Sequence, residues 1–282
     1  MSFSNKQYFF SIGSDQCILA NPQFTCFIAI YVDDILFLAP EDAVIQSVVN
    51  NLEKEFKIKD LGHVNNLLGM KIIQKKGKIT ISQVNYVIKL LEEFNMLDCK
   101  PKSTPMDNST QFSCLQSPNS EQEKSKMATK PYRSLIGKLH YLASHSRPDI
   151  TFAVSLLSRY NNNPGPCHWK GAKRILRYLR GTVDYCLVLK PQNLNLIGFC
   201  DADWGSQEDR KSTTGIVFSI GGGLIAWRCK KQQTVALSSM EAEYQAIALA
   251  VQELCWIASI CKELKMVSDC PVINEDNQAC MY

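Results

Sequence analysis

The 282-residue sequence lacks several features that would assign it to a particular class of protein. None of its twelve cysteines forms a C-x-x-C pair, which argues against a zinc or dithiol site. The segment Met1 to Asn5 has no secretory character, so we expect reduced thiols without a disulfide framework. No uninterrupted apolar run reaches the ~18 residues that would cross a bilayer, and we therefore expect no membrane function.

A strong charge of either sign is also missing. The net charge is +4, which permits a nucleic-acid partner but does not require one, because local clustering of charge matters more than the total. Hydrophobic residues make up 45% and charged residues 21%, as in ordinary globular proteins. The length is enough for two or three domains, each with a core of its own.

Apolar patterning predicts the elements of the first hundred residues. Phe24 to Ala39 reads as two short apolar strands, with Asp33 and Asp34 at the turn between them. Apolar residues then recur every fourth position, which predicts a helix beginning near Glu41. Residues 67–82 are typical of a hairpin, and Ser82 is placed to cap the helix that follows.

The middle of the chain changes character. From Asp98 to about Lys130 it is rich in Pro, Ser, Asn and Lys, which predicts a linker or extended surface segment. Helical patterning resumes at Tyr132 and again after Asp149. A further helix is expected over residues 166–180, with Gly181 following its end.

The last part of the sequence predicts three strands, a long helix and a fourth strand. The strands are expected at 196–200, 215–220, 224–228 and 271–274, and the helix at about 239–264. This order favours a mixed α/β layer over a Rossmann alternation.

Acidic residues stand where apolar segments end. Asp33 and Asp34 interrupt one apolar run, Asp201 follows a second, and Asp276 follows a third. A carboxylate at the end of a buried strand is costly unless a metal ion or hydrogen-bond donors compensate it. We therefore expect two metal-dependent sites, although turn chemistry explains the Asp-Asp pair about equally well.

The long C-terminal helix adds a further carboxylate. Glu243 shares a helical face with Ala246, Ile247 and Ala250, and an acidic residue on an apolar face favours a metal ligand. Glu241 lies three residues after Ser238, so a capping box accounts for it. We interpret Asp203 as a turn or supporting residue.

The predicted helix over residues 166–180 carries a basic stripe. Its members, which we call the α-helical basic stripe, are Lys170, Lys173, Arg174, Arg177 and Arg180. Trp169 and Tyr178 lie nearby, and a basic face beside aromatic residues suits a nucleic-acid backbone. A solvated face remains the alternative. The four histidines form no ligand-like pair.

Several short motifs of the sequence, taken together, resemble those of a known family. Tyr31-Val32-Asp33-Asp34 matches the Y-x-D-D box of reverse transcriptases. The other matching motifs are Lys59-Asp60-Leu61-Gly62, Leu68-Gly69-Met70-Lys71-Ile72, Ser82-Gln83, Ser103-Thr104-Pro105-Met106-Asp107, Tyr132-Arg133-Ser134-Leu135-Ile136-Gly137-Lys138-Leu139, Arg147-Pro148-Asp149-Ile150 and Arg177-Tyr178-Leu179-Arg180-Gly181-Thr182. In this order they resemble the polymerase and ribonuclease H part of a Ty1/copia-type retrotransposon Pol polyprotein.

The resemblance implies a domain organisation and an α+β, mixed α/β fold. Residues 1–97 would form the C-terminal part of a reverse-transcriptase palm with the start of the thumb, and residues 98–130 a linker. Residues 131–190 would form a helical thumb or connection region. Residues 191–282 would form an incomplete ribonuclease H-like fold.

The resemblance also implies site residues and ligands. Asp33 and Asp34 would hold Mg²⁺, with Mn²⁺ as an alternative ion, for DNA synthesis from dNTPs on an RNA template with a DNA primer. Asp201, Glu243 and Asp276 occupy the places of ribonuclease H carboxylates and would hold the same ions against an RNA–DNA hybrid. Gly69 would allow close approach of the primer, and the rest of the Pol polyprotein would be a further partner.

Two expected carboxylates are missing from the sequence. The third polymerase aspartate would precede Met1, and a fourth ribonuclease H carboxylate would follow Tyr282. We therefore expect the isolated chain to be inactive as a polymerase and feeble or inactive as a ribonuclease H. The alternatives are a non-catalytic nucleic-acid-binding remnant and a relic without function. The resemblance implies cytoplasmic virus-like particles, with the nucleus as a second compartment.

Overall fold

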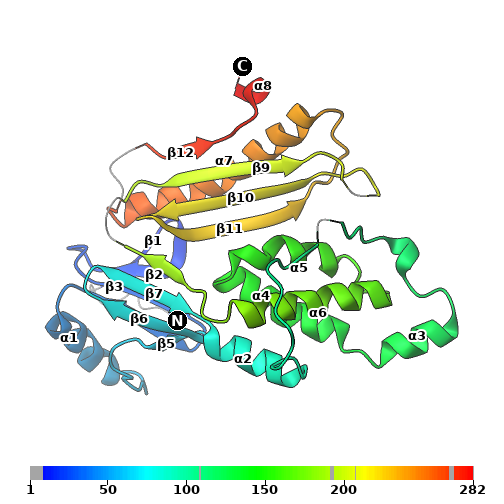
Figure 1. Cartoon of the computed structure of the whole chain (residues 1–282). Helices are drawn as coiled ribbons and strands as arrows, with labels where there is room; N and C mark the ends of the chain where they lie inside the picture. The colour runs from blue at the N-terminus through cyan, green and yellow to red at the C-terminus, as the bar shows by residue number, and fades with distance from the viewer. Residues whose placement is uncertain (1–8, 108, 191–193, 207, 267–269, 282) are drawn as a thin grey trace.

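The computed structural model describes residues 9–107, 109–190, 194–206, 208–266 and 270–281. Within these residues the chain forms sheets, a group of packed helices and one long helix behind the C-terminal sheet (Figure 1). The Met1 to Asn5 segment lies outside the described residues, so the expectation about a secretory signal is not tested there. All twelve cysteines are free in this structure.

The first sheet is antiparallel, and its four strands follow one another in chain order. They are β1 (Phe10–Ile12), β2 (Asp15–Ala20), β3 (Phe27–Tyr31) and β4 (Asp34–Leu38). Helix α1 (Asp42–Glu53) follows, with Glu41 as its N-cap residue, as the periodicity predicts. Its apolar stripe is only shallowly covered, because Val49 is the one buried residue of this helix.

The second sheet joins two parts of the chain that the sequence places in different regions. Its strands are β5 (Asn66–Leu67), β6 (Met70–Lys75), β7 (Lys78–Ser82) and β8 (Leu187–Leu189). The predicted hairpin is β6–β7, and β8 pairs antiparallel with β7 after the chain has passed through the helices. This pairing covers the edge of β7, whose backbone groups would otherwise lack strand partners. The predicted domain boundaries, which place β7 within residues 1–97 and β8 within residues 131–190, do not anticipate this pairing.

Helices between the two strands β7 and β8 form one apolar core. They are α2 (Val84–Glu93), α4 (Tyr132–His145), α5 (Thr151–Ser158) and α6 (Pro166–Gly181), with the short turn η3 (Pro148–Ile150) before α5. Ser82 does not cap α2: the N-cap residue is Gln83, while the Ser82 hydroxyl accepts from the Val84 N–H. The expected linker contains η2 (Cys114–Gln116) and α3 (Glu121–Ala128), each started by a serine N-cap.

The C-terminal unit has the predicted order of three strands, a helix and a strand. The elements are β9 (Ile197–Asp203), β10 (Thr213–Ile220), β11 (Gly223–Lys231), α7 (Ser239–Glu263), β12 (Val272–Asn274) and the short α8 (Gln278–Met281). The sheet order is β11-β10-β9-β12, and β12 runs parallel to β9. Helix α7 covers one face of this sheet with small residues, because Ala242, Ala246 and Ala250 are fully buried.

Helix α7 is also the one helix among the described residues that is long and apolar enough to cross a membrane. Its apolar residues do not form an uninterrupted run, because charged residues such as Glu243 and Glu253 lie among them. Its small side chains pack on β9 and β10 and belong to the apolar core of this unit. That packing accounts for the small apolar residues on the sheet-facing side of α7, while Tyr244, Val251 and Trp256 on other sides of the helix are exposed.

Polar contacts connect the C-terminal unit to the rest of the chain. The Ser14 N–H and hydroxyl both donate to Glu263, at 3.0 Å each, and the Trp256 indole donates to the Ser14 carbonyl. On the other face of the sheet, the Trp227 indole donates to the Ala143 carbonyl of α4 at 2.6 Å.

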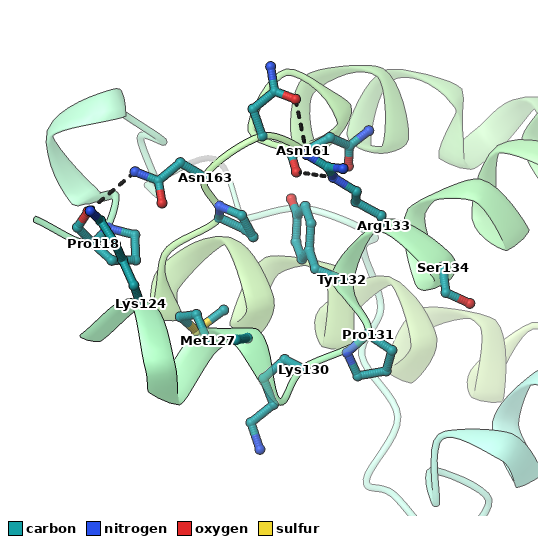
Figure 2. A pocket seen from close by; sticks show the side chains of 13 residues that line it. Pro118, Lys124, Met127, Lys130, Pro131, Tyr132, Arg133, Ser134, Asn161 and Asn163 are labelled. Atoms are coloured by element: carbon teal, nitrogen blue, oxygen red, sulfur yellow. Dashed lines mark hydrogen bonds between the residues drawn. The ribbon is translucent and has the colours of Figure 1, made fainter. Parts of the chain in front are cut away.

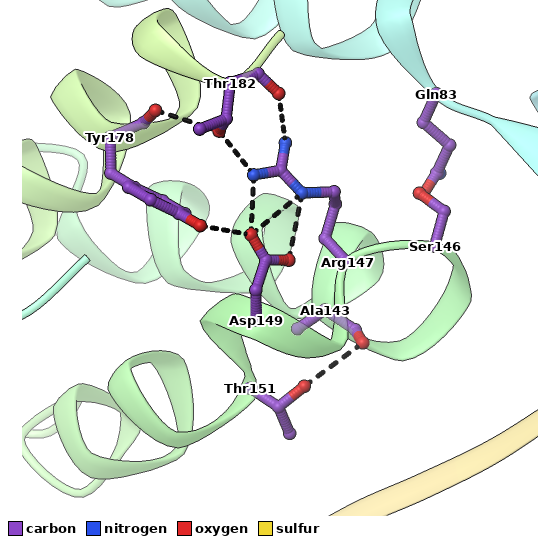
Figure 3. A network of polar contacts seen from close by, with 8 residues as sticks. All are labelled: Gln83, Ala143, Ser146, Arg147, Asp149, Thr151, Tyr178 and Thr182. Atoms are coloured by element: carbon purple, nitrogen blue, oxygen red, sulfur yellow. Dashed lines mark hydrogen bonds and ion pairs between the residues drawn. The ribbon is translucent and has the colours of Figure 1, made fainter. Parts of the chain in front are cut away.

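A buried guanidinium holds the helical unit together (Figure 3). Arg147 is 2% exposed and lies between α4 and η3. Its Nε and Nη2 donate to the Asp149 carboxylate at 2.7–3.2 Å, and its Nη1 donates to the Thr182 carbonyl at 3.0 Å. Tyr178 donates its hydroxyl to Asp149 at 2.8 Å. The rings of Tyr178 and Tyr185 lie 5.6 and 5.4 Å from the guanidinium carbon, so cation–π contact adds to the network.

Replacing Arg147 should therefore unfold the helical unit more easily than replacing an exposed cation. Arg147→Met leaves the Asp149 carboxylate partly buried without its partner, and we expect a loss of about 3–5 kcal/mol of unfolding free energy. The measurement is urea unfolding followed by circular dichroism. Lys124→Met, which breaks an exposed pair with Glu121, is the control and should cost less than about 1 kcal/mol. A loss for Arg147→Met no larger than that of the control would contradict this role.

A buried histidine makes the same unit sensitive to acid. His168 is fully buried and stacks on Tyr160 with ring centroids 3.9 Å apart. Its Nδ1 accepts the Gly165 N–H at 2.8 Å. This bond requires the neutral ring, because the protonated ring carries a proton on both nitrogens. Burial lowers the pKa of His168 from its ordinary value of 6.5.

This shift gives a pH dependence with a definite sign. The folded chain binds fewer protons at His168 than the unfolded chain, so the stability from the neutral ring is present above pH 6.5 and is lost as the pH falls below it. We expect the urea midpoint to fall less steeply on acidification in His168→Phe than in the unsubstituted chain. His140→Gln, at an exposed position, should keep the original slope. If the urea midpoint depends on pH with the same slope in all three proteins, His168 is not the source of the acid sensitivity.

Candidate functional site

Three carboxylates meet at one edge of the C-terminal sheet. Asp201 lies in β9, Glu243 in the second turn of α7, and Asp276 follows the end of β12. The parallel pairing of β9 with β12 brings the first and last of these together, and α7 supplies the middle one from the face of the sheet. One ligand oxygen from each lies within 4.8 Å of the others, and this is the one such acidic, His or Cys cluster found in the described residues.

The charge balance at this cluster is unfavourable without a cation. Glu243 is 7% exposed, and its Oε2 has no hydrogen-bond partner in the described part of the chain. Burial, followed by the charges of Glu275 and Asp201, raises the pKa of Glu243 to about 7. An orphaned carboxylate oxygen beside two more carboxylates matches the hard oxygen donor set of Mg²⁺ or Mn²⁺. The residues therefore fit a divalent cation.

Glu275 is a contributor to the site that sequence reasoning did not identify. The Cys200 thiol donates to its Oε2 at 3.1 Å, and the N–H groups of Asp276 and Asn277 donate to its Oε1 at 3.1 Å each. Burial, then the contact with Glu275, raises the pKa of Cys200 to about 12. Glu275 thus fixes the backbone that presents Asp276. The available signal was a second acidic residue directly before Asp276.

Two neighbouring acids have local supporting roles, although the capping box predicted for Ser238 and Glu241 is only half formed. Asp203 accepts the Thr213 N–H and the Ser206 hydroxyl, which ties the end of β9 to β10. Ser238 caps α7 by accepting the Glu241 N–H at 3.1 Å, and Glu241 accepts the Leu237 N–H at 2.7 Å. Both carboxylates are occupied by local hydrogen bonds. Neither belongs to the three-carboxylate cluster.

The Asp-Asp pair lies at the tight turn between β3 and β4. Tyr31 pairs with Asp34 across the turn, and both Asp33 and Asp34 are exposed. Val32 is 84% exposed and has φ +52°, a strained conformation for a β-branched residue, which is typical of functional turns. The described residues bring no third acidic, His or Cys ligand to this turn. The structure therefore shows two exposed carboxylates here, in contrast to the C-terminal cluster.

Gly69 has a structural use that the sequence does not reveal. It follows Leu68 in the turn between β5 and β6, and both have positive φ, +71° and +49°. A Cβ at Gly69 would lie 2.9 Å from the Tyr141 hydroxyl, which donates to the Leu68 carbonyl. The close approach that glycine allows here is made by a side chain of α4. Contact with a primer stays a prediction.

Three of the five residues in the α-helical basic stripe bind the segment before η2. Arg174 pairs with Asp107 at 3.1 Å, Arg177 donates to the Lys100 carbonyl at 2.7 Å, and Arg180 donates to the Leu97 carbonyl. For these arginines the structure supplies a role other than the predicted nucleic-acid contact: they hold residues 97–107 against α6. Lys170 and Lys173 have no hydrogen-bond or ion-pair partner within the described ranges.

The aromatic residues near the stripe are likewise used internally. Trp169 packs against Phe94 of α2 with ring centroids 6.3 Å apart, and Tyr178 is buried in the Arg147 network. Both rings pack against the apolar core of the helical unit, and a contact of either with nucleic acid stays a prediction.

Comparison with known proteins identifies the class to which these features belong. The family model described as "Reverse transcriptase (RNA-dependent DNA polymerase)" matches residues 17–108. The Pol polyprotein of transposon TNT 1-94 from Nicotiana tabacum is 38% identical over 285 residues, covering 99% of this chain and 21% of the relative. The Pol polyprotein of transposon RE2 from Arabidopsis thaliana is 36% identical over 268 residues, covering 94% and 18%.

A shorter relative matches over most of its own length. A transposon Ty5-1 protein from Saccharomyces cerevisiae is 36% identical over 232 residues, covering 81% of this chain and 73% of the relative. No solved structure matches. The chain belongs to the reverse transcriptase family of retrotransposon Pol polyproteins. It spans about a fifth of the length of the two plant Pol polyproteins.

Proposed function

We propose that the chain is part of a retrotransposon RNA-directed DNA polymerase joined to a ribonuclease H unit. The observation that carries the second activity is the cluster of Asp201, Glu243 and Asp276. These carboxylates come from the first strand, the first helix and the segment just after the fourth strand of the C-terminal unit, as the resemblance to ribonuclease H implies. Family membership supports the first activity, and the Asp33-Asp34 turn would be its nucleotide-transfer site.

The C-terminal carboxylates would hold Mg²⁺, with Mn²⁺ as an alternative. A bound divalent ion supplies an activated water and stabilises charge on a phosphate under attack. Glu243 offers its orphaned Oε2 from within the unit, while the exposed Asp201 and Asp276 leave the solvent side open to an RNA–DNA hybrid. Glu275 keeps Asp276 in place through two backbone N–H bonds.

The Asp33-Asp34 turn gives less support to polymerase activity of the isolated chain than the C-terminal cluster gives to ribonuclease H activity. The two carboxylates are exposed, and no third ligand lies near them among the described residues. A metal site with too few ligands holds its geometry poorly, and catalysis falls steeply with misplacement. We propose that these 282 residues alone do not polymerise DNA.

The substrates and location follow from the family and are also proposals. The partners would be an RNA template, a DNA primer, dNTPs and the rest of the Pol polyprotein. The work would take place in cytoplasmic virus-like particles, with the nucleus as a second compartment.

A second candidate function is a non-catalytic nucleic-acid-binding remnant. The unpartnered ammonium groups of Lys170 and Lys173 favour it, because they remain available to phosphates even if neither carboxylate site turns over. This candidate predicts salt-dependent binding of duplex without cleavage.

Hydrolysis of a labelled RNA–DNA hybrid distinguishes the two candidates. With the purified chain in excess and Mn²⁺ or Mg²⁺ present, we expect slow cleavage of the RNA strand that disappears on chelation. Glu243→Gln removes the inner carboxylate and should reduce the rate at least about a hundredfold. Asp33→Asn, at the other acidic site, is the matched control and should leave the rate unchanged. A parallel reaction with dNTPs should give no templated extension.

Two results would count against the proposal. Salt-dependent hybrid binding with no cation-dependent cleavage would favour the non-catalytic candidate. Templated extension that is lost in Asp33→Asn would show that the isolated chain is a polymerase after all.

A further inference from the structure

A pocket of about 460 Å³ lies between α6 and the segment that its arginines hold in place. Its size is within the ~300–1,000 Å³ range of small-molecule sites. The residues that line it are Lys102, Pro105, Met106, Asp107, Thr110, Phe112, Leu157, Cys167, Lys170, Gly171, Lys173, Arg174 and Arg177. One wall is therefore a helix face, and the other is the chain before η2.

The pocket is strongly basic. Five of its lining residues are cationic and one, Asp107, is acidic. Asp107 is already paired with Arg174, and hydrogen bonds from Ser109 are the main cause of its lowered pKa. Arg177 is tied to the Lys100 carbonyl. Lys170 and Lys173 keep ammonium groups without a partner in the described residues, so the pocket has positive charge available for an anion.

Part of its lining is apolar. Met106, Phe112 and Leu157 contribute hydrocarbon and an aromatic ring. A simple inorganic anion would leave this surface uncovered. A group with both a planar apolar body and a phosphate would use the two parts of the pocket at once.

The second pocket of the helical unit lacks this combination (Figure 2). It has a similar volume, about 430 Å³, and also contains cations. There Arg133 donates to Asn161 and Asn162, and Lys124 pairs with Glu121. Two of its three basic side chains, Lys124 and Arg133, are thus satisfied within the chain. This pocket therefore provides positions for charge-matched controls.

We propose that the pocket beside α6 holds one unpaired nucleotide of a single-stranded nucleic-acid tail. The base would lie against Met106 and Phe112, and the flanking phosphates would contact Lys170 and Lys173. This inference rests on the proposed nucleic-acid function and adds a site that reads strandedness, because a base inside a duplex is stacked and cannot enter. It also assigns a use to the two lysines of the basic stripe that the fold leaves unpartnered.

The test compares a blunt RNA–DNA hybrid with the same hybrid carrying a single-stranded tail, by fluorescence anisotropy. We expect the tail to tighten binding about tenfold, which is the scale of one stacked base. Thr110→Trp fills the pocket without changing charge and should abolish this gain while blunt-hybrid affinity stays the same. Lys170→Glu with Lys173→Glu should weaken tail binding further and reduce its salt dependence. Lys124→Glu with Lys130→Glu is the charge-matched control.

A native thiol gives a second readout at the site. Cys167 lines the pocket, while the exposed Cys114 does not. The tailed hybrid should slow alkylation of Cys167 and leave that of Cys114 unchanged, as measured by peptide mass spectrometry. Binding of blunt hybrid with no gain from the tail would overturn this inference and leave the proposed function intact. Failure of both hybrids to bind would overturn both.

Discussion

The fold depends on how the buried charge of Arg147 is satisfied. Its guanidinium is almost fully removed from water, so it needs acceptors from several directions at once. Asp149 and Thr182 supply them, and they come from the start of η3 and the residue after α6. The network therefore fixes the spacing between two helix ends. Helix α4, which leads into Arg147, in turn supports β11 through the bond from Trp227 to Ala143.

A second constraint is electrostatic and acts at the C-terminal cluster. Three carboxylates within 4.8 Å repel one another, and the buried position of Glu243 makes the repulsion more costly. Among the described residues no cation contributes to the pKa shift of Glu243, and the neighbouring Glu275 adds negative charge. Proteins keep such an arrangement at functional sites, where a bound cation offsets the cost. The sheet and helix α7 fix the relative positions of the three carboxylates.

Local patterns in the sequence predicted most of the elements and the C-terminal carboxylates. The period of the apolar residues located α1, α6 and α7, and acidic residues on apolar surroundings marked Asp201, Glu243 and Asp276. What the sequence did not predict depends on contacts between distant residues. The pairing of β8 with β7, the contact of Tyr141 with Leu68 and the use of Arg174 to hold Asp107 leave no local pattern. A basic stripe looks the same whether its partner is a phosphate or a backbone carbonyl.

The measurement that tests the central claim most directly is X-ray diffraction from crystals of the chain soaked in Mn²⁺, recorded to show the anomalous signal of the ion. The account predicts a peak bounded by carboxylate oxygens of Asp201, Glu243 and Asp276. Crystals of Glu243→Gln, soaked in the same way, should lose it. Absence of a peak at this cluster in the unsubstituted chain, with the three side chains ordered, would contradict the assignment of a cation site and with it the proposed ribonuclease H activity.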